Sequence, residues 1–282
     1  MEVFLDCLPC MLRQVLEASR MATDDVDIQQ QIIDETFKIL PDYRHYACSP
    51  ELAMVMHQIV NKHTSKSDLY RAIKDRDIAA AKQCYPDLEK FWKDNQSSLY
   101  WALKISATGN SLDAAISQSV DMRQVITKEL QKPFDQCDLT SFENKLKTAS
   151  SILIVGDNAG ETVFDRILVK FMMPRHVYYA VRNAPIINDA IIEDANNSSL
   201  DQYATILSNG CNAPGAILDQ CNESFLDLFH KVDLVISKGQ GNFEALSGCD
   251  RDVYFLLKAK CSVIAKELGV GQNEYVFKCS NS

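Results

Sequence analysis

An acid and an amide stand directly after a run of aliphatic residues in the segment 151–161, which reads SILIVGDNAGE. Such runs are typical of strands buried in a parallel sheet, where ligands bind beyond the carboxyl ends. Asp157 and Asn158 therefore stand where chemistry is expected, and Ala159 and Gly160 open a predicted helix whose N-terminus favours an anion. Oxygen ligands beside such a helix end indicate a divalent metal ion and a phosphate. The alternative is that both polar residues only cap the helix.

A second polar cluster follows the β-branched and aromatic run 176–181, in the sequence RNAPIINDA. It offers Asn183, Asn188 and Asp189. A proline ends the strand, so Asp189 is expected in the connection to the next helix, where it could face Asp157 across one cleft. Taken alone, Asp189 is equally well explained as an acid that complements a helix dipole.

A third cluster, KGQGNFEAL, follows the predicted strand 232–237. Lys238 emerges as that strand ends and is suited to bind a phosphate. Gly239 and Gly241 permit close approach of the main chain to a ligand, and Asn242 is expected to cap the next helix. The pattern matches neither a Walker loop nor a dinucleotide fingerprint.

Strand and helix patterns alternate after residue 150, which predicts an α/β fold with a doubly wound, mostly parallel sheet. The predicted strands are 151–155, 177–181, 204–208, 232–237, 252–257 and 262–265. Before residue 150 the patterns are helical, and Thr140 with Glu143 forms a predicted capping box. We therefore expect a helical cap domain over residues 1–150 and a Rossmann-like domain over residues 151–282, with the cleft between them.

The connection after the predicted strand 204–208 carries further polar and glycine residues, which could line the pocket or serve only a turn. They are Ser208, Gly210, Asn212 and Gly215.

Composition excludes several classes of partner. The 282 residues are 46% hydrophobic and carry a formal net charge of −9, without the basic patch that a nucleic-acid surface needs. No apolar stretch reaches the length of a membrane span, and the N-terminus lacks the order of a secretory signal, so a cytoplasmic protein is expected. Cys7 and Cys10 form a C-x-x-C pair that could bind a soft metal or cycle as a dithiol, or could simply lie on the buried face of the first helix.

Together, these motifs resemble those of the metal-dependent damage-control phosphatases, once called domain of unknown function 89. The resemblance is carried by GDNAGE, PIINDA, KGQGNFE and FLLKAKCSVIA, and it extends through ATGNSLD and the N-terminal DCLPC, so it covers nearly the whole chain. DCLPC is similar to the small, cysteine-containing subfamily of archaea and bacteria.

The resemblance implies a phosphatase that uses magnesium, manganese, cobalt or nickel to remove phosphate from small phosphorylated metabolites, including damaged sugar phosphates. By motif position, Asp157, Asn158 and Asp189 would hold the metal ion. Lys238 would hold the substrate phosphate. Asn110 and Asp113 would close the pocket from the helical side. Other subfamilies carry an acid where this chain has Gln240.

Physical chemistry supports the same assignment without fixing the nucleophile. Phosphoryl transfer rests on positioning and on charge neutralisation, which a divalent ion, a lysine and a helix N-terminus supply. The attacking group is either an activated water, which we favour, or the Asp157 carboxylate. Two other functions stay open: an S-adenosylmethionine-dependent carboxyl methyltransferase, and a module that binds a phosphometabolite without turnover. The chain lacks the glycine-rich turn typical of a nucleoside site after its first strand.

Overall fold

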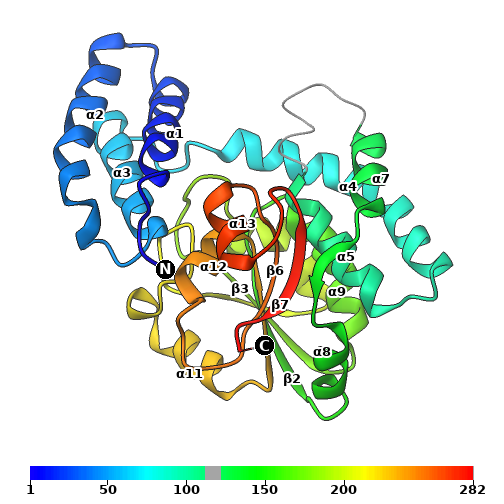
Figure 1. The fold of residues 1–282 in the computed structure, drawn as a ribbon. Coiled ribbons are helices and arrows are strands. Elements are labelled where there is room, and N and C mark those ends of the chain that lie inside the picture. The colour runs from blue at the N-terminus through cyan, green and yellow to red at the C-terminus, as the bar shows by residue number, and fades with distance from the viewer. Residues whose placement is uncertain (112–121, 282) are drawn as a thin grey trace.

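The computed structural model describes residues 1–111 and 122–281, and these form a seven-stranded sheet in the order β1-β7-β6-β5-β2-β3-β4 (Figure 1). All neighbouring strands are parallel except β6 and β7, which are antiparallel. The fold is therefore the predicted mostly parallel α/β type. The strands are β1 (Phe134–Cys137), β2 (Ser151–Val155), β3 (His176–Val181), β4 (Thr205–Ser208), β5 (Leu234–Lys238), β6 (Tyr254–Lys258) and β7 (Tyr275–Cys279).

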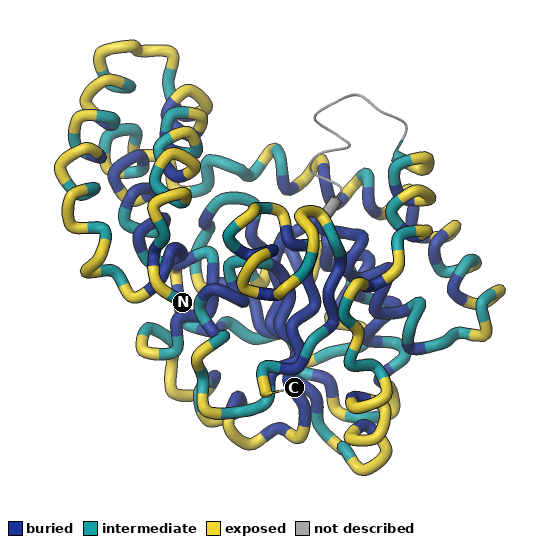
Figure 2. Tube along the Cα trace, viewed as in Figure 1, coloured by how far each residue is buried: buried dark blue, intermediate teal, exposed yellow. Residues whose placement is uncertain are grey.

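Helices pack on both faces of this sheet. They are α4 (Arg71–Asp94), α5 (Leu99–Thr108), α7 (Met122–Gln131), α8 (Leu139–Leu146), α9 (Glu161–Met172), α10 (Ile192–Asn197), α11 (Glu223–Lys231), α12 (Gln240–Leu246) and α13 (Ser262–Leu268). Short 3-10 helices also occur at η2 (Gly109–Ser111), η3 (Leu200–Gln202) and η4 (Leu218–Gln220). Alternate residues of β2 serve the two sides: Ile152 and Ile154 join a core with α4, α5 and α9, whereas Leu153 and Val155 join a core with α11, α12 and α13. Both faces of β2 are thus buried, which explains its uninterrupted apolar sequence (Figure 2).

The remaining helices form a separate unit at the N-terminal end. These are α1 (Cys7–Ala22), α2 (Val26–Ile39), the 3-10 helix η1 (Leu40–His45) and α3 (Ser49–Thr64). They surround a small core of their own, and in Figure 1 they stand beside the sheet rather than over it. By contrast, α4 and α5 share the main core with β2, although they also precede residue 150. The division into domains at residue 150 stays a prediction.

The sequence prediction was wrong for three segments. Residues 262–265, predicted as a strand, lie in α13, because a four-residue apolar run has no period that separates strand from helix. Strands β1 and β7 were not predicted. Their places in the sheet come from pairing with each other, across about half of the chain, rather than from a local pattern.

Two local predictions also differ from the structure. Helix α8 begins at Leu139 after Asp138, so Thr140 lies inside the helix and forms no capping box with Glu143. On α1, Cys7 is partly buried but Cys10 is exposed, so the pair does not share a buried face. No helix in residues 1–111 or 122–281 has both the length and the apolar character needed to cross a bilayer.

The strand order creates a switch point beside β2. The chain runs from β2 outward through β3 and β4 on one side, while β5 and β6 lie on the other. The helices that follow β2 and β5 lie on opposite faces of the sheet, α9 in one core and α12 in the other. In doubly wound sheets, ligands bind in the crevice at the carboxyl ends of strands at such a switch point. The polar residues after β2, β3 and β5 lie at these carboxyl ends.

Candidate active site

Backbone hydrogen bonds join the connections that follow β2 and β3. Ala190 N–H donates to the Asp157 carbonyl at 2.8 Å, and Ala159 N–H donates to the Asn188 carbonyl at 2.8 Å. Asn158 and Asp189 form an isolated antiparallel bridge between the same two segments. The structure therefore brings together the three residues predicted to bind a metal, all of them buried.

Arg182, which follows β3, holds the two aspartates in place. Its Nε donates to Asp189 Oδ2 at 2.7 Å, and its Nη2 lies 3.8 Å from Asp157 Oδ1. Asn242 accepts from Arg182 Nη1 at 2.9 Å and donates to the carbonyls of Gly156 and Lys238, at 2.8 and 2.7 Å. The prediction that Asn242 caps a helix was wrong, because it lies inside α12 and links strands β2, β3 and β5.

Glu161, the first residue of α9, connects the aspartates to the helical side. Its Oε1 accepts from Asn110 Nδ2 at 2.5 Å and from Asn158 Nδ2 at 3.0 Å. Asn110, in η2, also donates to Asp157 Oδ2 at 3.1 Å, and its contact with a substrate stays a prediction. Burial raises the pKa of Glu161, and the charge of Lys238 opposes that rise.

Lys238 ends β5 in a fully enclosed position. Its Nζ donates to Glu161 Oε2 at 2.7 Å, to Asp165 Oδ1 at 2.5 Å and to the Ser106 carbonyl at 3.3 Å. The two carboxylates raise the pKa of Lys238, and burial works in the opposite direction. Lys238 thus neutralises acids at the base of the crevice, and its binding to phosphate stays a prediction.

Asp165 anchors the base of this network. Its Oδ1 also accepts from Ser106 Oγ at 2.5 Å, and its Oδ2 accepts from Tyr179 Oη at 2.5 Å. Residues of α5, α9, β3 and β5 therefore share one carboxylate. Because every partner is buried, we expect the base of the site to be rigid.

Two glycines sit against the acids in different ways. Gly239 has a φ of +79°, and a Cβ at this position would lie 1.9 Å from Asp157 Oδ2, so only glycine fits. Gly160 precedes α9 and packs on α4, where a Cβ would lie 3.1 Å from the Asp77 Cβ. The positive end of α9 already has the Glu161 carboxylate in its first turn, and binding of phosphate at Gly160 stays a prediction.

The donor set suits a hard divalent cation. The network contains four carboxyl groups and two cations: Asp157, Glu161, Asp165 and Asp189, with Arg182 and Lys238. Burial raises the pKa of Asp157, and the neighbouring Asp189 adds to the rise, because two close carboxylates resist ionising together. Asn110 Oδ1 is buried without a hydrogen-bond partner. An added cation would relieve this excess of oxygen ligands and negative charge.

Among the described residues, no three His, Cys, Asp or Glu side chains are arranged to hold a metal ion. The candidate set combines Asp157 and Asp189 with the amide of Asn158, which is the donor chemistry of magnesium and manganese rather than of zinc.

Lys260, in the connection after β6, is an exposed cation near the aspartates. The charge of Lys260 lowers the pKa of Asp157, so Lys260 lies within electrostatic range of the aspartates.

Asp113, predicted to bind substrate, lies outside the described residues. The connection after β4 reaches the site where Ala216 N–H donates to Asn242 Oδ1 at 2.9 Å.

Comparison with known proteins shows the family of this chain. The sequence model of the damage-control phosphatase ARMT1-like domain matches residues 3–276. The chain belongs to the damage-control phosphatase family. The resemblance seen in the motifs is therefore confirmed.

Archaeal relatives of the same family match along nearly their whole length. A damage-control phosphatase from Pyrococcus horikoshii is 31% identical over 98% of this chain and 97% of its own. One from Archaeoglobus fulgidus is 30% identical over 96% of this chain and 97% of its own. The crystal structure of a DUF89 family protein from Pyrococcus horikoshii has a TM-score of 0.90 to this chain, with 29% identity and 98% coverage of both.

Three residues at the centre of this candidate site were missed by sequence reasoning: Glu161, Asp165 and Arg182. Asn242 was named, but with the role of a helix cap instead of its observed bonds to Arg182 and the strand ends. Glu161 ends the GDNAGE motif, and Asp165 follows it by one helical turn, so two acids spaced to share one face of the predicted helix were the available signal. A charged residue at the end of a buried strand was the signal for Arg182.

Proposed function

We propose that this chain is a metal-dependent phosphatase of small phosphorylated metabolites in metabolite repair, working with magnesium, manganese, cobalt or nickel. Relatives at about 31% identity that carry the name damage-control phosphatase support a phosphatase role. The observation that carries the metal dependence is the buried excess of carboxylates at the ends of β2 and β3, with Asn110 Oδ1 unpaired among them. A cytoplasmic location stays a prediction.

In this proposal, Asp157, Asn158 and Asp189 hold the metal ion. The bound ion would neutralise charge on the phosphoryl oxygens and lower the pKa of a water molecule, which is the chemistry it supplies in such sites. Arg182 keeps the two aspartates oriented through its bonds to Asp189 and Asn242. Activated water is the favoured nucleophile, and the Asp157 carboxylate is the alternative.

Two lysines divide the phosphate-binding role. Lys238 stays in the proposal as the cation at the base of the crevice, although its Nζ must leave Glu161 or Asp165 to reach a phosphate. Lys260 is exposed and already acts on Asp157 through its charge, so it can approach a phosphate without breaking a buried ion pair. Gly160, Gly239, Asn110 and Asp113 complete the proposed substrate contacts.

The test is phosphate release from p-nitrophenyl phosphate and from a panel of sugar phosphates. Protein stripped of metal by a chelator should be inactive, and activity should return with one or more of the four metals. Asp157→Ala should abolish release while circular dichroism shows an intact fold. Asp227→Ala is the matched control, because Asp227 is an exposed acid on α11.

Each other outcome favours a different function. Metal-dependent affinity for a phosphometabolite without release would favour the binding module. Binding of S-adenosylmethionine without phosphatase activity would favour the methyltransferase. Release that persists in Asp157→Ala would overturn the ligand assignment.

A further inference from the structure

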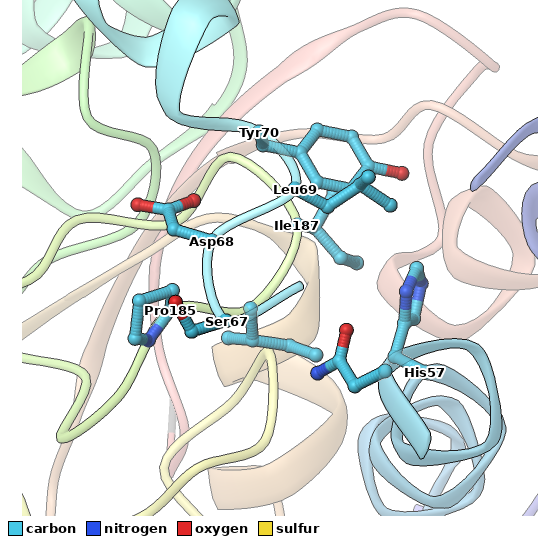
Figure 3. Close-up of a pocket in the computed structure, with 9 residues that line it drawn as sticks. His57, Ser67, Asp68, Leu69, Tyr70, Pro185 and Ile187 are labelled. Atoms are coloured by element: carbon cyan, nitrogen blue, oxygen red, sulfur yellow. The ribbon is translucent and has the colours of Figure 1, made fainter. Parts of the chain in front are cut away.

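A small cavity lies beside the connection that carries Asp189 (Figure 3). Three segments line it: α3, the connection from α3 to α4, and the connection from β3 to α10. Its lining residues are His57, Asn61, Ser67, Asp68, Leu69, Tyr70, Pro185, Ile186 and Ile187. The Asp189 N–H donates to the Ile186 carbonyl at 3.1 Å, so one hydrogen bond separates the cavity wall from the candidate metal ligand.

His57 is the histidine in this lining, and one of its ring nitrogens has no hydrogen-bond partner. Its side chain is only 4% exposed, and Nε2 has no hydrogen bond. Figure 3 shows the His57 ring directed from α3 toward the side of the cavity where Tyr70 and Ile187 lie. A buried ring nitrogen without a partner costs free energy, which a ligand with a matching group would recover.

The electrical character of the cavity limits the ligand class. Burial alone lowers the pKa of His57 to about 4, so its ring is neutral at pH 7 and offers no charge to an anion. Burial also raises the pKa of Tyr70 to about 12, which keeps its phenol neutral. Leu69, Ile186 and Ile187 add apolar walls. The charged residue of the lining is Asp68, whose Oδ1 has no hydrogen-bond partner and whose Oδ2 lies 2.8 Å from Lys74 Nζ. A second phosphate or a carboxylate would meet this acid, whereas a hydroxyl group can both donate and accept.

The size and position of the cavity narrow the class of ligand further. The free volume is about 10 Å³, which is room for one water molecule or one hydroxyl group. Ile187 and Asp189 are two residues apart, so their Cα atoms are at most about 7 Å apart. A phosphate ester held at Asp189 could therefore place a hydroxyl group of its organic part in this cavity.

We propose that this cavity is the subsite that receives a hydroxyl group of the substrate's organic part, with His57 as a specificity-determining residue. The inference rests on the proposed phosphatase function and adds the location of substrate selection. Ile187 supports it, because a β-branched residue with a φ of 46° is strained, and such strain persists where the surroundings fix a functional conformation.

The experiment compares two substrates on the metal-loaded full chain. A hydroxylated sugar phosphate can use the subsite, whereas p-nitrophenyl phosphate has no hydroxyl group in its leaving part. His57→Phe should lower kcat/KM for the sugar phosphate about 10-fold, the equivalent of one hydrogen bond, and change kcat/KM for p-nitrophenyl phosphate less than about 2-fold. His57→Gln, which restores a polar nitrogen, should recover part of the loss. His45→Gln is the matched control, since His45 is exposed.

The outcomes separate this inference from the function on which it rests. An equal loss for both substrates would mean that His57 only supports the fold, and no loss for either would mean that the cavity does not meet the substrate. Both results overturn the subsite and leave the phosphatase intact. Wild-type protein that releases no phosphate from either substrate with any metal would instead overturn the proposed function, and the subsite with it.

Discussion

At the scale of single residues, the site depends on close approach between main chain and carboxylate. Gly239 turns the chain after β5 with a left-handed φ, and this brings its Cα beside Asp157. Asp157 is then held from several directions, by Asn110, by Arg182 and by the backbone at Gly239. Small side-chain changes beside Asp157 should therefore lower activity more than they lower stability.

Gly239→Ala is expected to reduce phosphatase activity by about 100-fold or more, because a displaced Asp157 misplaces the reacting groups. The added Cβ would overlap Asp157 Oδ2 and would also require an unfavourable φ. Metal-loaded kcat/KM with p-nitrophenyl phosphate measures the loss. Gly248→Ala is the control, because a Cβ there has no neighbour within 4 Å. Equal activities of the two variants would contradict the tight contact at Asp157.

The same scale shows which parts of the site the sequence could predict. Asp157, Asn158, Asp189 and Lys238 were predictable because polar residues that end buried parallel strands meet at one edge of the sheet. Their pairing was not predictable. Lys238 binds Glu161, which is 77 positions away, and such an ion pair is decided by packing rather than by local spacing.

At the scale of elements, helix α5 lies beside strands β1 and β7. It presents Lys104 to two aromatic rings of these strands. Lys104 Nζ lies 3.1 Å from the ring centre of Tyr275 and 5.3 Å from that of Phe134, and it has no hydrogen-bond partner. Burial lowers the pKa of Lys104 from 10.5 to about 7, and attraction to the rings offsets part of the cost.

Lys104→Met should therefore stabilise the protein at pH 7, by about 1–3 kcal/mol. Between pH 7 and 10.5 the unfolded chain binds more protons at this lysine than the folded protein does, so wild-type stability should rise with pH across this window. Denaturant unfolding at pH 7 and pH 10 measures both effects. The advantage of the variant should shrink at the higher pH, and a constant advantage would refute the desolvated amine. Lys128→Met, at an exposed position, is the control.

The elements themselves were predictable where their patterns were strong. Strand β2 was predicted with its observed bounds, because four apolar residues followed by Gly-Asp-Asn leave little choice. Strand β1 has only Phe134 buried, so its sequence FDQC does not differ from that of a loop until β7 pairs with it. The strand prediction for residues 262–265 was wrong because a short apolar run fits a helix equally well.

At the scale of the whole molecule, the chain contains cores of unequal size. The N-terminal unit of α1, α2 and α3 buries a small set of side chains, whereas the sheet is covered on both faces. Contact between the two parts includes α3, which packs against α12 and also supplies His57 to the proposed subsite. The small core should be the weaker one.

Native-state hydrogen exchange should reveal this difference. Amides in α1 and α2 are expected to open with a lower free energy than amides in β2, β3 and β5, because local opening of the N-terminal unit exposes less apolar surface. Peptide-resolved mass spectrometry under native conditions measures both groups. Identical opening free energies would show that the N-terminal unit and the sheet unfold as one.

The strand order has a consequence for the order of synthesis. Strand β1 is translated before all the other strands, yet its partner in the sheet is β7, the last strand along the chain. During translation, β1 therefore has no partner strand while β2 to β6 are synthesised. The antiparallel return of β7 beside β6 then supplies the edge on which β1 can dock. Folding during translation is therefore completed only when β7, the last strand, pairs with β1, the first strand. This long-range step should be slow.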